Sequence, residues 1–218
     1  MEAKGGQFQA QRGRLLDSLR RELHDQRVVE AIAAVPREAF VPAELRDQAY
    51  EDRALPIGEG QTISQPLMVG LMIQALEPDP KGRVLEVGTG SGYAAAVLSK
   101  LVAEVVTVER SDVLLDLARR TLETLGLSNI RSYPAGDRLG RQEDAPYDGI
   151  LVSAGAPHVP RILLKQLAPG GRLAIPVGGP RSQELVTAQS TPRGVELRRH
   201  GPCAFVPLIG DEAWREAG

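Results

Sequence analysis

The feature that most constrains the fold is a short apolar run leading directly into three closely spaced glycines, Val84-Leu85-Glu86-Val87-Gly88-Thr89-Gly90-Ser91-Gly92-Tyr93. From this point short apolar runs alternate with segments of helical periodicity. That alternation is typical of a parallel sheet covered by helices on both faces, so we expect a doubly wound α/β fold. The predicted strands are 83–87, 105–108, 130–133, 149–153 and 172–177, and the predicted helices are 92–101, 112–125 and about 159–167.

The two ends of the chain have a different character from this central α/β part. Residues 8–23 and 28–36 carry apolar positions at helical spacing, which predicts two packing helices. Residues 51–65 read as an ordered loop that leads into a helix beginning near Pro66. After Gly179, two alternating segments at 184–189 and 195–208 predict antiparallel strands at the edge of the sheet. We therefore expect a single domain over 1–218. It consists of an N-terminal helical and loop part (1–80), a central α/β part (81–179) and C-terminal antiparallel strands (180–218).

Composition and charge exclude several classes of protein. A length of 218 residues with 42% hydrophobic residues is sufficient for one proper core. Twenty-six basic against twenty-eight acidic residues give a net charge of −2, so we expect no nucleic-acid partner. The single cysteine, Cys203, and the three histidines predict neither a disulfide nor a metal site. No apolar stretch is long enough to span a membrane or to act as a signal sequence, so we expect a cytoplasmic protein. We also expect a monomer.

The glycine loop indicates the kind of ligand. Glycines at 88, 90 and 92 allow the backbone to turn tightly and to approach a ligand at the carboxyl end of the first strand, where open α/β sheets bind ligands. A dinucleotide site would place its third glycine at position 93, where this chain has Tyr93. The carboxylate of Glu86 would repel a phosphate but suits a cationic amino-acid and sulfonium ligand. The pattern therefore favours S-adenosylmethionine over NAD.

Two further carboxylates follow the next strands. Glu109 ends the second strand, at the position where such folds place an acidic side chain against the ribose hydroxyls. Asp137 follows the third strand and could contact an adenine amino group. Each residue also has a simpler interpretation: Glu109 as a solvated carboxylate at a strand end, Asp137 as a turn former, and the glycine loop as a tight connection.

Several motifs together resemble one known family. They are Thr62-Ile63-Ser64-Gln65-Pro66, the glycine loop, Ala145-Pro146-Tyr147-Asp148, the run from Leu167 to Gly178, Phe205-Val206-Pro207-Leu208, and Trp214. In this combination the sequence resembles the protein-L-isoaspartate (D-aspartate) O-methyltransferases from about Arg14 onward. The glycine loop is shared by many class I methyltransferases, whereas the 62–64 and 206–208 motifs are narrower. The fold implied by the resemblance is a Rossmann-like class I methyltransferase.

The resemblance also implies roles for individual residues. Ser64 would lie at the active site beside the reacting carboxylate and would be the catalytic residue. The implied cofactor site is formed by Thr62, Ile63, Glu86, Gly88, Thr89, Gly90, Ser91, Gly92, Glu109, Asp137 and Arg138. Arg138 stands where family members often have glycine. His158 and Cys203 are interpreted as a surface residue and a packed residue, because neither has an assignable catalytic partner.

The reaction implied by the resemblance is methyl transfer from S-adenosylmethionine to the free α-carboxylate of L-isoaspartyl residues, with D-aspartyl residues as further acceptors. The partners are then isoaspartyl-containing peptides and proteins, and the role is protein repair. Two alternatives remain open: a related carboxyl methyltransferase that esterifies a normal aspartate in a dedicated peptide, and a cofactor-binding paralogue without catalysis.

Overall fold

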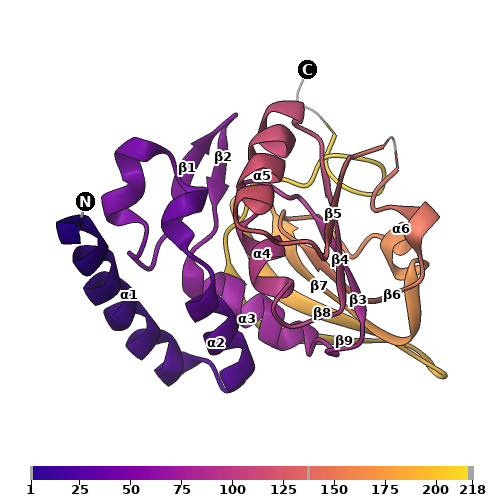
Figure 1. The fold of residues 1–218 in the computed structure, drawn as a ribbon. Helices are drawn as coiled ribbons and strands as arrows, with labels where there is room; N and C mark the ends of the chain where they lie inside the picture. Colours follow the sequence, from indigo (N-terminus) through magenta and orange to yellow (C-terminus); the bar gives the residue numbers. More distant parts are fainter. Residues whose placement is uncertain (1, 137, 216–218) are drawn as a thin grey trace.

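The computed structural model describes residues 2–136 and 138–215, and its centre is a seven-stranded sheet (Figure 1). The strand order is β5-β4-β3-β6-β7-β8-β9, parallel from β5 to β7 and antiparallel beyond. The strands are β3 (Arg83–Val87), β4 (Glu104–Glu109), β5 (Ile130–Pro134), β6 (Tyr147–Val152), β7 (Leu167–Gly179), β8 (Ser182–Thr191) and β9 (Gly194–Cys203). The predicted α/β class, the parallel core and the antiparallel edge are confirmed.

Strand β3 lies between β4 and β6, and this placement creates a switch point in the topology. The chain leaves β3 toward β4 and β5 on one side, then returns to form β6 on the other side of β3. Connections on either side of β3 diverge, so a crevice opens beyond its carboxyl end. The glycine loop, residues 88–92, follows β3 and borders this crevice.

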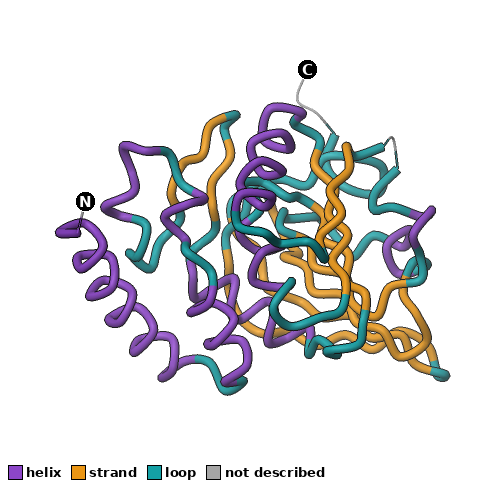
Figure 2. Tube along the Cα trace, viewed as in Figure 1, coloured by secondary structure: helices purple, strands orange, loops and turns teal. Residues whose placement is uncertain are grey.

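Helices and 3₁₀ turns surround the sheet (Figure 2). They are α1 (Glu2–Glu22), α2 (Gln26–Ala34), η1 (Arg37–Phe40), η2 (Ala43–Gln48), α3 (Pro66–Leu76), α4 (Tyr93–Leu98), α5 (Asp112–Thr124), η3 (Gln142–Asp144) and α6 (Arg161–Leu164). Ser111 caps α5, its hydroxyl accepting a hydrogen bond from the Leu114 amide at 3.3 Å. Figure 1 places α1 and α2 at one side of the molecule and α6 at the other.

Alternate residues of the parallel strands face two separate apolar clusters. Val84 and Val105 pack with α2, α3 and α4, whereas Leu85 and Val106 pack with residues around α6. This period of two is expected for strands buried on both faces. Glu86 follows Val84 by two positions, so it faces the α4 side of the sheet.

Three predicted elements differ from the structure. Residues 51–65 are not only a loop, because β1 (Leu55–Gly58) and β2 (Gln61–Ile63) form an antiparallel hairpin there. Helix α6 spans four residues, so the predicted helix of about 159–167 is too long, and β7 already begins at Leu167. Strand β9 ends at Cys203, so residues 204–208 are not strand. The Phe205 amide donates to the side chain of Gln183 at 2.8 Å, which turns the chain toward the crevice.

We predict that Leu98→Ala lowers the free energy of unfolding by about 2–5 kcal/mol, because it opens a cavity beneath α4. Leu98 is 0% exposed, whereas Leu117 on α5 is 51% exposed and provides the matched control. Leu117→Ala should change stability by less than about 0.5 kcal/mol. Urea unfolding of both variants measures the difference, and equal losses would contradict the described packing of α4.

Candidate functional site

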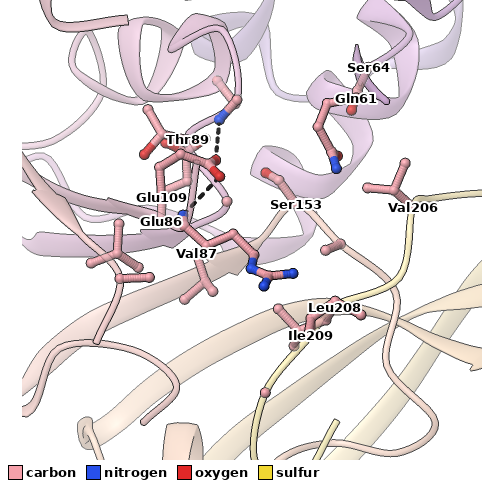
Figure 3. A pocket seen from close by; sticks show the side chains of 18 of the residues that line it. Gln61, Ser64, Glu86, Val87, Thr89, Glu109, Ser153, Val206, Leu208 and Ile209 are labelled. Atoms are coloured by element: carbon pink, nitrogen blue, oxygen red, sulfur yellow. Dashed lines mark hydrogen bonds between the residues drawn. The ribbon is translucent and has the colours of Figure 1, made fainter. Parts of the chain in front are cut away.

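A pocket of about 420 Å³ lies at the carboxyl ends of β3, β4 and β6, within the range that small ligands occupy. Five segments line it, and Figure 3 shows side chains from each. They are the 61–64 segment, the end of β3 with the glycine loop and residues 93–94, residues 108–110, residues 135–136 and 138–140 with 153–154, and the C-terminal tail, residues 206–210. Predicted site residues occur in the first four of these segments, with Arg138 in the fourth. The segments come from distant parts of the chain, so only the fold brings them together.

The glycine loop adopts backbone angles that require glycine. Gly88, Gly90 and Gly92 have φ values of 95°, 52° and 87°, in the region that residues with a Cβ rarely adopt. The Gly88 amide donates to the carbonyl of Val108 at 2.9 Å, which ties the loop to the end of β4. Gly92 is not among the pocket residues. A Cβ at this position would lie 3.2 Å from the Cβ of Ala118 on α5, so Gly92 allows close packing of the loop.

Glu86 is fully buried at the floor of the pocket, beneath the loop. Its Oε2 accepts a hydrogen bond from the Thr107 hydroxyl at 2.6 Å, and that hydroxyl lies 2.6 Å from the hydroxyl of Thr89. Its Oε1 is buried and has no hydrogen-bond partner among the described residues. Burial raises the pKa of Glu86 to about 8, with a contribution from the charge of Glu109. An unpaired buried carboxyl oxygen favours a cation or a donor in the pocket.

Glu109 is held rigidly at the end of β4 by three backbone amides. Its Oε2 accepts from Gly90 at 2.8 Å, and its Oε1 accepts from Arg110 at 2.8 Å and from Ser111 at 3.0 Å. The carboxylate is 7% exposed and lines the pocket, so it is not the solvated strand-end residue of the simpler interpretation. Oε1 already accepts two bonds, so the acceptor site that remains for a ligand is on Oε2. Glu109 therefore joins the glycine loop to β4 and presents a carboxylate to a ligand.

The 61–64 segment faces the glycine loop across the pocket (Figure 3). Gln61, Ser64 and the opposite Ser153 give this end of the pocket a polar lining. Neither Ser64 nor Thr62 caps the following helix. The N-cap of α3 is Gln65, without a side-chain capping bond, and the Leu67 amide donates instead to Asp52 at 2.9 Å.

The C-terminal tail also lines the pocket, a position that was not predicted from the sequence. Gly155 donates to the carbonyl of Val206 at 2.8 Å, and Leu208 donates to the carbonyl of Gly155 at 2.8 Å. A Cβ on Gly155 would approach the Gln183 side chain to 3.0 Å, so a small residue is needed for this arrangement. The narrow Val206-Pro207-Leu208 motif was the signal that could have identified the tail as part of the site.

The other predicted site residues are placed as follows. Thr62, Ile63, Thr89, Ser91 and Arg138 line the pocket. Asp137 lies outside the described residues.

The two residues without an assignable catalytic partner lie outside this pocket. His158 is exposed and is not among the pocket residues. Cys203 is half-buried, and burial raises the pKa of its thiol to about 11. Within residues 2–136 and 138–215, no helix is long and apolar enough to cross a membrane, and no cluster of His, Cys, Asp or Glu could hold a metal ion.

We predict that the stability of the ligand-free protein falls with rising pH because of Glu86. The folded protein keeps this carboxyl protonated up to about pH 8, whereas the unfolded chain releases the proton above its ordinary pKa of 4.5. Between these values the unfolded state binds fewer protons, so the free energy of unfolding decreases by up to about 1.4 kcal/mol per pH unit. Urea unfolding at several pH values, compared with Glu86→Gln, isolates this contribution. A difference between the two proteins that is independent of pH would contradict it.

Comparisons with known proteins agree with this geometry. Residues 10–213 match the family model described as Protein-L-isoaspartate(D-aspartate) O-methyltransferase. The chain is 51% identical over 208 residues to the Protein-L-isoaspartate O-methyltransferase of Roseiflexus castenholzii, covering 95% of each chain. A solved protein-L-isoaspartate O-methyltransferase aligns with a TM-score of 0.82 and 30% identity, covering 93% of this chain and 67% of the other.

A second solved structure, from Plasmodium falciparum, is described as a protein-L-isoaspartate O-methyltransferase in complex with S-adenosyl-L-homocysteine. It aligns with a TM-score of 0.76 and 26% identity over 88% of this chain and 95% of the other. The family model and the relative each cover nearly the whole chain, including both the glycine loop and the 61–64 segment. The chain therefore belongs to the protein-L-isoaspartate (D-aspartate) O-methyltransferase family.

Proposed function

We propose that this protein transfers the methyl group of S-adenosylmethionine to the free α-carboxylate of L-isoaspartyl residues in damaged proteins. The observation that supports this function best is that one pocket joins the glycine loop to the 61–64 segment. The first has the features of a cofactor site, and the second carries Ser64 at the edge where an acceptor would enter. The resulting ester would close to a succinimide, whose hydrolysis returns part of the damaged residue to a normal aspartyl linkage. We place this repair in the cytoplasm.

The pocket residues fit the cofactor chemically. S-adenosylmethionine supplies an activated methyl group on a positively charged sulfur. The buried, unpaired Oε1 of Glu86 suits the cationic amino-acid end of such a ligand, and the remaining acceptor site of Glu109 suits a ribose hydroxyl. The glycine loop allows the ligand to lie directly against the backbone. Arg138, which lines the pocket, would border the adenosine end.

The acceptor does not need a general base. A carboxylate is already an anionic nucleophile at neutral pH, because its ordinary pKa is about 4. The protein then has to orient the acceptor oxygen, exclude water and align the reacting atoms at about 3–3.5 Å. Ser64 can donate a hydrogen bond to one carboxylate oxygen, leaving the other to react. The absence of a catalytic His/Asp pair among the described pocket residues agrees with this chemistry.

The function is tested by a methyl-transfer assay with isoaspartyl and normal aspartyl versions of one peptide. We expect turnover of the isoaspartyl peptide alone. Turnover of the normal peptide alone would identify the related carboxyl methyltransferase, and binding of S-adenosylhomocysteine without turnover of either peptide would identify a cofactor-binding paralogue.

We predict that Ser64→Ala lowers kcat by at least about tenfold, because a hydrogen bond to a charged oxygen contributes about 1.5–3 kcal/mol. The dissociation constant for S-adenosylhomocysteine should remain close to that of the wild type, since the hydroxyl faces the acceptor. Steady-state kinetics and calorimetry measure the two effects. Weaker cofactor binding with unchanged kcat would remove Ser64 from the acceptor site.

We predict the opposite pattern for Glu109→Ala. Loss of carboxylate contacts worth about 1.5–3 kcal/mol should weaken binding of S-adenosylhomocysteine by roughly 10-fold to 150-fold. Calorimetric titration measures this change. Because Glu109 also accepts the Gly90 amide, Glu109→Gln is the companion variant that retains an acceptor for the loop. An unchanged dissociation constant in both variants would exclude Glu109 from the cofactor site.

A further inference from the structure

Arg37 is a buried cation that the proposed chemistry does not use. Its side chain is 0% exposed and extends from η1 into the interior between the N-terminal region and the sheet. Burial lowers the pKa of Arg37, while Tyr93 and Asp52 favour its charged form. Burying such a group is costly unless it is well bonded, so its contacts indicate what it holds in place.

The contacts of Arg37 lie on two different parts of the molecule. Its Nε donates to the carbonyl of Ala49 at 2.8 Å, and its Nη2 donates to the carbonyl of Arg53 at 3.3 Å. Both carbonyls belong to the segment between η2 and β1, which we call the 49–53 turn after its residues. Its guanidinium carbon lies 4.8 Å from the centre of the Tyr93 ring. Tyr93 is the first residue of α4, directly after the glycine loop, and lines the pocket.

The 49–53 turn in turn holds the other side of the pocket. Asp52 accepts a hydrogen bond from the Leu67 amide through Oδ1 at 2.9 Å and one from the Gln65 side chain through Oδ2 at 3.0 Å. Gln65 follows Ser64 directly in the sequence, and Leu67 lies two positions further on. The contact with Leu67 supplies the helix cap that Gln65 does not provide. A continuous set of contacts thus runs from Tyr93 through Arg37, the 49–53 turn and Asp52 to the residues that follow Ser64.

We propose that Arg37 and Asp52 are positioning residues, which fix Ser64 relative to the glycine loop through the 49–53 turn. This inference rests on the proposed function, in which Ser64 orients the acceptor opposite the methyl donor. Alignment to within about 1 Å is decisive for a displacement reaction, and a misplacement of that size costs up to about 100-fold in rate. Neither residue is among those that line the pocket, so both act through other groups.

The decisive variant is Asp52→Ala, because Asp52 is exposed and its loss leaves the core intact. Two controls match it. Asp25→Ala removes an equivalent side-chain cap, that of α2, whose Arg27 amide donates to Asp25 at 3.0 Å. Glu51→Ala removes a carboxylate from the same turn, where it pairs with Arg53 on the surface.

We expect Asp52→Ala to lower kcat for the isoaspartyl peptide by about tenfold or more, with the dissociation constant for S-adenosylhomocysteine within about twofold of the wild type. Asp52→Asn should recover part of the loss, because its amide oxygen can accept the Leu67 bond but its amide nitrogen cannot accept the Gln65 bond. Both controls should retain the wild-type kcat, although Asp25→Ala should lower the melting temperature as Asp52→Ala does. A kcat for Asp52→Ala equal to that of the controls, or a loss of cofactor affinity as large as the loss of kcat, would overturn the proposal.

Hydrogen exchange of the ligand-free protein provides a readout that does not depend on turnover. Asp52→Ala should speed exchange at residues 61–67 and leave the glycine loop unchanged, and unchanged exchange at 61–67 would overturn the proposal. If the wild type fails to methylate isoaspartyl peptides, the proposed function is wrong, and the exchange experiment still decides whether Asp52 holds this segment.

Arg37→Lys tests the contacts that Arg37 makes with Tyr93 and with the 49–53 turn. Lysine keeps the charge but cannot reach both carbonyls while covering the ring of Tyr93. We expect faster exchange in the 49–53 turn and at 61–67, and a smaller effect of Asp52→Ala on kcat in the Arg37→Lys background than in the wild type. Fully additive losses would show that the two residues act separately and would overturn the connection.

Discussion

The structure depends on the parallel pairing of β3 with β4 on one side and β6 on the other. Parallel strands need crossover connections, and these diverge from β3 in opposite directions, which leaves a crevice at its carboxyl end. The glycine loop occupies this position because the first crossover begins there. Every other part of the pocket is arranged around the crevice, including the 61–64 segment from the N-terminal part and the tail from the C-terminal part. The topology of the sheet therefore determines where a ligand binds, and the side chains determine which ligand is recognised.

The side chains that face the crevice favour a positively charged ligand. Glu86 and Glu109 present two carboxyl groups to one pocket, and the repulsion between them contributes to the raised pKa of Glu86. A ligand with a cationic group relieves both this repulsion and the unpaired state of Glu86 Oε1. The Thr107 and Thr89 hydroxyls complete a hydrogen-bonded chain from β3 to β4 and the loop, so the carboxyl group is fixed in orientation. This electrostatic pattern is consistent with membership of a methyltransferase family and with a carboxylate acceptor that needs no base.

The N-terminal part contributes more than a cover for the sheet. Its helices bury one face of the sheet, and its 49–53 turn, held by Arg37, contacts the start of α3 through Asp52. These contacts connect the start of α4, which follows the glycine loop, with the start of α3, which follows Ser64. Transfer of a methyl group requires a donor and an acceptor to meet in a narrow range of geometries, and a buried charge with directional bonds is suited to impose that range.

The sequence alone determined the fold class, most strand positions and the candidate residues Glu86 and Glu109. These features follow from local patterns: apolar periodicity, glycine spacing, and carboxylates at strand ends. Ser64 was identified through the resemblance of its motif to a known family. Only the tertiary structure decided that 51–65 contains a hairpin, that residues after Cys203 leave the sheet, and that Asp52 caps α3. Each of these depends on a partner far away in the sequence, such as Gln183 for Phe205 or Asp52 for Leu67. A local sequence pattern does not identify such a partner, because the contact forms only once the fold has brought the two segments together.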